Sequence, residues 1–95
     1  VIAEANTLVN RFPETVAIYF LVRRGKARIV VMVGDKAKEA GLNAGIIARR
    51  LATICGGKAG GSVRLGQGGG LDASRIPSEK EILEEVLKTK AGTPS

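Results

Sequence analysis

A glycine-rich stretch over residues 56–70, GGKAGGSVRLGQGGG, constrains this 95-residue chain more than any other feature. More than half of the stretch is glycine, and predicted helices lie on both sides of it. Glycine loses the most conformational entropy on folding and adds no side chain to the packing. Such a concentration is therefore typical of a backbone that takes positive φ angles, or of one that a neighbour approaches more closely than a Cβ allows.

A disordered glycine–serine linker is the alternative interpretation. Lys58 and Gln67 interrupt the glycines, however, and residues 63–65 (VRL) favour a short strand. The stretch therefore indicates a loop that presents bare backbone N–H groups and two cations, Lys58 and Arg64, to a phosphate-bearing partner.

The two common phosphate-binding loops do not match. A P-loop requires Ser or Thr after its Gly-Lys pair and follows a strand, whereas here Ala59 follows and a helix precedes. A dinucleotide-binding GxGxxG motif would need glycine where Leu71 or Ala73 stands. Nucleotide hydrolysis and dinucleotide binding are accordingly disfavoured.

The composition favours an anionic partner and disfavours catalysis. Fifteen Lys and Arg residues against nine acidic residues give a net charge of +6, which suits nucleic acid. The absence of histidine removes Ser–His and Cys–His pairs and most transition-metal sites. The single cysteine, Cys55, falls on the apolar face of a predicted helix and is expected in the core. We therefore predict no catalytic residue, no metal and no cofactor.

Periodicity and turn signals predict helix, β-hairpin, helix, glycine-rich strand and helix. The elements are expected at residues 1–12, 15–23, 26–33, 43–55 and 63–68, and from Ser78 onward. Residues 15–23 are apolar on both faces, which predicts a central strand. Asn43 and Ser78 are the predicted N-caps, and Gly56 the predicted helix stop.

The basic residues at the tip of the hairpin have two interpretations. Arg23, Arg24, Lys26 and Arg28 form either a solvated turn or a contact for a polyanion. The three aromatic side chains, Phe12, Tyr19 and Phe20, are expected to be buried. The final helix is expected to bury Ile82, Leu83, Val86 and Leu87.

These patterns predict an α/β fold in which helices pack on a small mixed sheet, with a glycine-rich loop and an edge strand. We expect one domain over residues 1–91 and a frayed tail over residues 92–95. The chain begins without methionine, so a fragment of a longer protein is expected. The chain offers no stretch for a membrane span.

Four sequence segments together resemble the DHH-associated domain, in the form found at the C-terminus of alanyl-tRNA synthetases. They are Ala44-Gly45, Gly56-Gly57-Lys58-Ala59-Gly60-Gly61, Gln67-Gly68-Gly69-Gly70 and Asp72. Gly66 stands where the family usually has alanine, and Val63 and Leu65 replace a more polar part of its loop.

The resemblance implies a non-catalytic domain that grips folded tRNA and aids aminoacylation and editing by a parent alanine–tRNA ligase in the cytoplasm. The implied partners are tRNA(Ala), other domains of the parent and a second copy of the chain, with no membrane. Two alternatives stay open: the substrate-binding domain of a DHH-type phosphoesterase, and an accessory domain of a free-standing alanyl-tRNA editing protein. A purely structural dimerisation module is a third, because Ile46 lies on the polar side of its helix.

The candidate RNA contacts combine cations with bare backbone, which favours recognition of folded RNA by shape and phosphate contact over base stacking. They are Arg49, Arg50, Gly57, Lys58, Gly60, Gly61, Arg64, Gln67, Gly68 and Gly69.

Overall fold

The computed structural model describes residues 2–89, so the predicted domain end at residue 91 and the predicted tail lie outside the described residues. In chain order the elements are α1 (Ile2–Arg11), β1 (Val16–Arg23), β2 (Lys26–Val33), α2 (Asp35–Glu39), α3 (Ala44–Ile54), β3 (Lys58–Gly61), β4 (Leu65–Asp72), the 3-10 turn η1 (Ala73–Arg75) and α4 (Glu79–Lys88). The predicted α/β class is confirmed.

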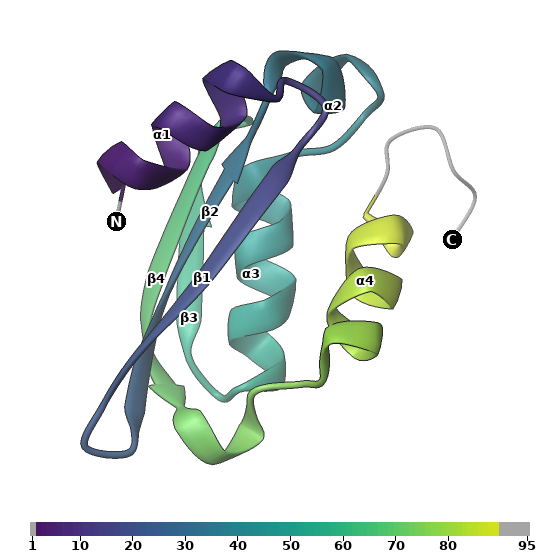
Figure 1. Ribbon diagram of the computed structural model, residues 1–95. Helices are drawn as coiled ribbons and strands as arrows, with labels where there is room; N and C mark the ends of the chain where they lie inside the picture. Colours follow the sequence, from purple (N-terminus) through teal and green to yellow (C-terminus); the bar gives the residue numbers. More distant parts are fainter. Residues whose placement is uncertain (1, 90–95) are drawn as a thin grey trace.

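Four strands form one sheet in the order β1-β2-β4-β3 (Figure 1). All three pairings are antiparallel. The sequence pattern predicts a mixed sheet, and the sheet is antiparallel instead. Helices α3 and α4 lie on one face of the sheet, and α1 lies on the other face near the α2 end. Among residues 2–89, no helix covers the rest of that second face, toward the turn between β1 and β2.

Two clusters of apolar side chains hold these layers together. On β2, Ile29 and Val31 are fully buried in the larger cluster with Leu51 of α3. Met32, on the opposite face of β2, packs instead with Val9 of α1. Alternate residues of one strand therefore stabilise opposite sides of the sheet.

Local signals set the helix ends as predicted. The Asn43 side chain accepts a hydrogen bond from the Ile46 N–H, and Gly56 follows the end of α3 with a φ of +76°. Ser78 Oγ accepts from the Glu81 N–H at 3.3 Å and donates to the Glu81 carboxylate at 3.2 Å. The bonds from the Ile46 and Glu81 N–H groups satisfy terminal backbone donors that the helices leave without intrahelical partners.

The strand assignments differ from the predictions in two places. β1 pairs with β2 alone, so it lies at an edge of the sheet and is not a central strand. Both of its faces are apolar because alternate residues pack into the two apolar clusters on opposite sides of the sheet. The strand predicted at residues 63–68 is confirmed at residues 65–68, which belong to β4, but its predicted start is wrong because Val63 and Arg64 lie in the turn of a β-hairpin that the glycine stretch forms. β3 is the outer arm, and β4 pairs with β2 inside the sheet.

Three side chains predicted to be buried are exposed. Phe12 is 46% exposed at the end of α1, and Leu83 and Leu87 are 58% and 55% exposed on α4. Among the four apolar residues predicted for the buried face of α4, Val86 alone is buried, because α4 packs mainly beside α3 and leaves an open groove between itself and β1.

Candidate nucleic-acid interface

The glycine hairpin packs against α3 through its backbone. The Ala44 N–H donates to the Val63 carbonyl at 2.7 Å, and the Gly45 N–H donates to the Ser62 carbonyl at 2.8 Å. A Cβ on Gly66 would lie 2.8 Å from the Ala48 Cβ, closer than carbon atoms pack. Several glycines are therefore required by close packing within the fold.

The candidate glycines divide between packed and open positions. A Cβ on Gly57 would lie 2.7 Å from the Gly69 carbonyl oxygen, and one on Gly61 or Gly68 would overlap the neighbouring arm of the hairpin. A Cβ on Gly60 would meet nothing within 4 Å, and one on Gly69 would meet only Arg28 Cγ, at 3.9 Å. Gly60 and Gly69 are thus the candidates whose backbone a ligand can approach.

These open positions lie on the sheet face opposite α3. Ala59 packs against the core on the α3 side, so its neighbours Lys58 and Gly60 point to the other face. Gln67 pairs directly with Gly60, and Gly69 pairs with Lys58. The structure thus brings together four of the candidate residues on one open surface.

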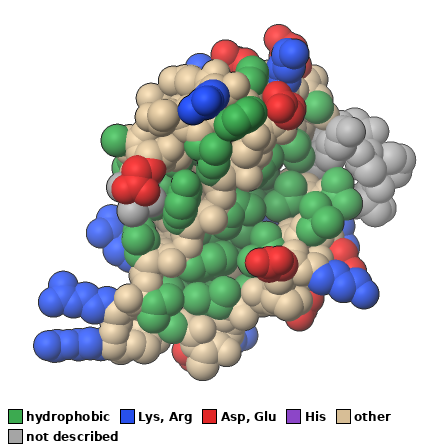
Figure 2. Space-filling view, in the orientation of Figure 1, with side chains coloured by type: hydrophobic (Ala, Val, Ile, Leu, Met, Phe, Trp, Pro, Cys, Tyr) green, Lys and Arg blue, Asp and Glu red, His purple; other side chains and the backbone are tan. Residues whose placement is uncertain are grey.

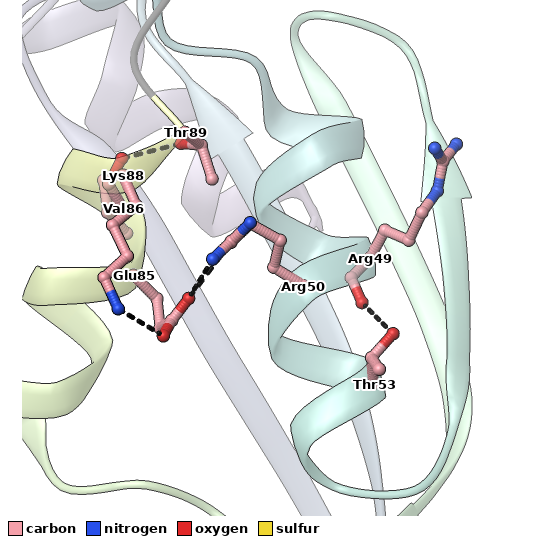
Figure 3. Close-up of polar contacts among 7 residues, drawn as sticks. All are labelled: Arg49, Arg50, Thr53, Glu85, Val86, Lys88 and Thr89. Atoms are coloured by element: carbon pink, nitrogen blue, oxygen red, sulfur yellow. Dashed lines mark hydrogen bonds and ion pairs between the residues drawn. The ribbon is translucent and has the colours of Figure 1, made fainter. Parts of the chain in front are cut away.

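Arg49 and Arg50 lie elsewhere, on the exposed side of α3 (Figure 3). Arg50 is bound to Glu85 of α4 by hydrogen bonds of 2.8 and 3.0 Å from its Nη2 and Nε. The Arg50 hydrogen bond, opposed by partial burial and helped by Lys88, lowers the pKa of Glu85 below its ordinary value. Arg49 extends away from this pair and is not ion-paired within residues 2–89.

Arg64 lies in the turn of the glycine hairpin and forms a 3.1 Å ion pair with Asp35 of α2. Lys58 starts β3, at the opposite end of that strand. The four candidate cations therefore do not form one cluster, and two of them already have a carboxylate partner.

A second basic cluster occupies the tip of the β1–β2 hairpin. Arg23, Arg24, Lys26 and Arg28 surround a shallow hollow that Leu21, Ala27 and Gly70 also line. Residues 26–29 alternate between exposed and buried side chains, with Lys26 and Arg28 exposed and Ala27 and Ile29 buried. This period-two pattern is the sequence signal that could have placed Lys26 and Arg28 on the open sheet face.

The other side of the molecule carries an apolar groove between β1 and α4 (Figure 2). Its lining comprises Val16, Ile18, Phe20, Ile82, Leu83 and Val86, with Glu79 at its edge. Its side chains offer no cluster of acids, bases or nucleophiles.

Groups suited to metal binding or nucleophilic attack are sparse in the described part of the chain. No three His, Cys, Asp or Glu side chains gather there as potential metal ligands. Cys55 is buried as predicted, and burial raises the pKa of its thiol, with Arg75 opposing that effect. Among residues 2–89, no helix has the length and apolar character to span a bilayer.

Comparison with known proteins places this geometry in a family. The family model described as the DHHA1 domain matches residues 1–89. The alanine–tRNA ligase of Leifsonia xyli subsp. xyli is 42% identical over 66 residues, which cover 70% of this chain and 7% of that protein. The alanine–tRNA ligase of Geobacillus thermodenitrificans is 29% identical over 87 residues, covering 92% of this chain and 10% of that protein. The chain thus spans a tenth or less of these relatives.

A solved structure shares the fold. The crystal structure of the C-Ala domain from Aquifex aeolicus alanyl-tRNA synthetase superposes with a TM-score of 0.69 at 24% identity. The match covers 90% of this chain and 79% of that chain.

Proposed function

This chain belongs to the DHHA1 domain family, and we propose that it is the tRNA-binding C-terminal domain of an alanine–tRNA ligase. The observation that carries the proposal is the similarity to curated alanine–tRNA ligases over about two thirds of the chain or more. These relatives favour a ligase over the phosphoesterase and editing-protein alternatives. The fold shared with a C-Ala domain supports the same parent.

The charge and surface of the chain support RNA as its ligand. A net charge of +6 attracts a polyanion, and cations on an open sheet face suit phosphate contacts along folded RNA. The proposed domain holds tRNA(Ala) for aminoacylation and editing, while the chemistry takes place in other domains of the parent. We further propose that those domains, and a second copy of the chain, are its protein partners, in the cytoplasm.

The test uses a full-length parent ligase that contains this chain, with and without residues 1–95. We expect the truncated enzyme to bind tRNA(Ala) more weakly and to lose both tRNA alanylation and deacylation of mischarged tRNA(Ala). Alanine activation, measured by ATP–pyrophosphate exchange without tRNA, is the internal control and should stay unchanged. Unchanged affinity for tRNA(Ala) in the truncated enzyme would contradict the proposal.

A further inference from the structure

We propose that the phosphate-binding surface of this domain is the open end of the sheet, formed by Arg23, Arg24, Lys26, Arg28 and Lys58 around Gly69. We call these residues the tip surface. Its ligand is the sugar–phosphate backbone of folded RNA, and the inference rests on the proposed function in tRNA binding. The tip surface shares Lys58 and Gly69 with the RNA contacts predicted in the glycine stretch, and its other members are the hairpin-tip cations that the sequence leaves open between a solvated turn and a polyanion contact.

Strand register brings Arg23, Lys26, Arg28 and Lys58 onto one face, and Arg24 lines the same hollow from the hairpin turn. Arg23 pairs with Lys26 across the β1–β2 hairpin, and Lys26 and Arg28 alternate with the buried Ala27 and Ile29. Lys58 pairs with Gly69. A row from Arg28 through Gly69 to Lys58 therefore crosses three adjacent strands on the face opposite α3.

Nothing in the described fold covers this row. Helix α1 packs at the far end of the same face, against Ala17 and Met32. Gly69 places no side chain between Arg28 and Lys58, and the open Gly60 lies two residues along β3 from Lys58. The backbone between the cations is therefore accessible to a rigid, convex ligand such as an RNA helix.

The cations of the tip surface are available for an external anion. Within residues 2–89 none of the five forms an ion pair, in contrast to Arg50 and Arg64. Asp72 pairs with Lys26 in the strand register, but its carboxylate accepts hydrogen bonds from the Ser74 N–H and hydroxyl, at 3.0 and 2.7 Å. Each of these cations can therefore neutralise an RNA phosphate without first giving up a carboxylate, and each phosphate neutralised releases counterions condensed on the RNA.

Arg24, in the turn between β1 and β2, has a backbone conformation that residues other than glycine rarely adopt. Arg24 has a φ of +51° and Gly25 a φ of +76°, as in the two-residue hairpin turns in which asparagine usually takes the first position. Arg24 is the only non-glycine residue with positive φ in the described chain. A side chain held in such a conformation points to a functional reason for its presence.

The experiment measures how the affinity of the chain for tRNA(Ala) depends on salt concentration. The test variant carries Arg24→Asn, Arg28→Gln and Lys58→Gln; asparagine suits the positive φ, so the turn is kept. The control variant carries Lys38→Gln, Lys80→Gln and Lys88→Gln, which remove the same charge from α2 and α4. Both are compared with wild type and with Arg49→Gln, and all are checked for equal thermal stability.

Removing one phosphate contact should reduce the slope of log affinity against log salt by roughly 0.7–0.9, so the slope of the test variant should fall by roughly 2–3. The control variant and Arg49→Gln should keep the wild-type slope. A second, unrelated tRNA should show the same reduction, since phosphate contacts do not specify sequence. If the triple variant unfolds, Arg24→Asn alone should reduce the slope by roughly 0.7–0.9.

Two results overturn the inference in different ways. If wild type binds tRNA and the slope falls equally in the test and control variants, the tip surface has no special role while the proposed function stands. If neither wild type nor the full-length parent shows tRNA binding that depends on this chain, the proposed function fails and the tip surface fails with it.

Discussion

Replacing Gly68 by alanine tests whether close packing between the two strands of the glycine hairpin requires glycine. Gly68 faces its cross-strand partner Ala59, and an added Cβ would lie 2.7 Å from the Ala59 Cα and overlap the Ala59 Cβ and the Lys58 carbonyl oxygen. Carbon atoms pack at about 3.5–4.0 Å, so the two strands would have to separate by about 1 Å. β3 is only four residues long and cannot move this far without losing its pairing.

The expected loss is about 3 kcal/mol of unfolding free energy, the upper part of the usual range for overpacking. For a domain of this size that corresponds to a fall in Tm of roughly 12–24 °C. Gly70→Ala meets no atoms but must adopt a φ of +71°, which should cost about 1–2 kcal/mol. Gly69→Ala makes only an ordinary contact with Arg28 and should stay within about 0.5 kcal/mol of wild type.

Thermal and urea unfolding of the chain, followed by circular dichroism, measure this series. The predicted order of stability is wild type and Gly69→Ala, then Gly70→Ala, then Gly68→Ala. The reasoning is refuted if Gly68→Ala unfolds within about 0.5 kcal/mol of wild type, or if Gly69→Ala is the least stable of the three.

Two further predictions concern ionisable groups, and a third concerns catalysis. Glu85→Gln should lower the free energy of unfolding by up to about 1 kcal/mol at pH 7, because it removes the ion pair with Arg50. Because that pair lowers the pKa of Glu85, the difference in urea midpoint from wild type should be full above pH 4.5 and vanish as the pH falls well below it. A pH-independent difference would contradict this. The buried Cys55 thiol, whose pKa burial raises, should react with a maleimide at pH 7 far more slowly in the folded chain than in urea, and equal rates would show that it is accessible. The purified chain should show no aminoacylation, deacylation or phosphodiesterase turnover; turnover that one substitution in this chain abolishes would disprove its non-catalytic role.

The parts of the fold that the sequence predicts correctly are those that depend on neighbouring residues. Asn43, Gly56 and Ser78 mark helix ends because capping involves groups at most four residues apart. The Arg24-Gly25 turn likewise fixes the first hairpin and its register.

The errors come from contacts between distant segments. β1 is apolar on both faces because α1 contacts one and α4 the other, a pattern that a central strand would also show. Glycine has low strand propensity, so the composition of β3 and β4 does not specify them. β4 is specified by pairing with β2, β3 by pairing with β4, and both by packing on α3. The Arg50–Glu85 pair joins residues 35 positions apart. No local sequence pattern could therefore predict that Arg50 has a carboxylate partner.

The glycine hairpin therefore has two separable roles on its two faces. On the α3 side, Gly66 and Gly68 leave no space for a Cβ, and the fold alone explains them. On the open side, a Cβ at Gly60 or Gly69 would fit without strain, so packing does not account for glycine there. An ordinary solvated sheet face would carry side chains at such positions, which would improve strand propensity at no steric cost. Bare backbone beside Arg28 and Lys58 is instead what a close-approaching phosphate backbone requires, and the proposed tip surface accounts for the cations, for Gly69 between them and for the open Gly60 beside Lys58.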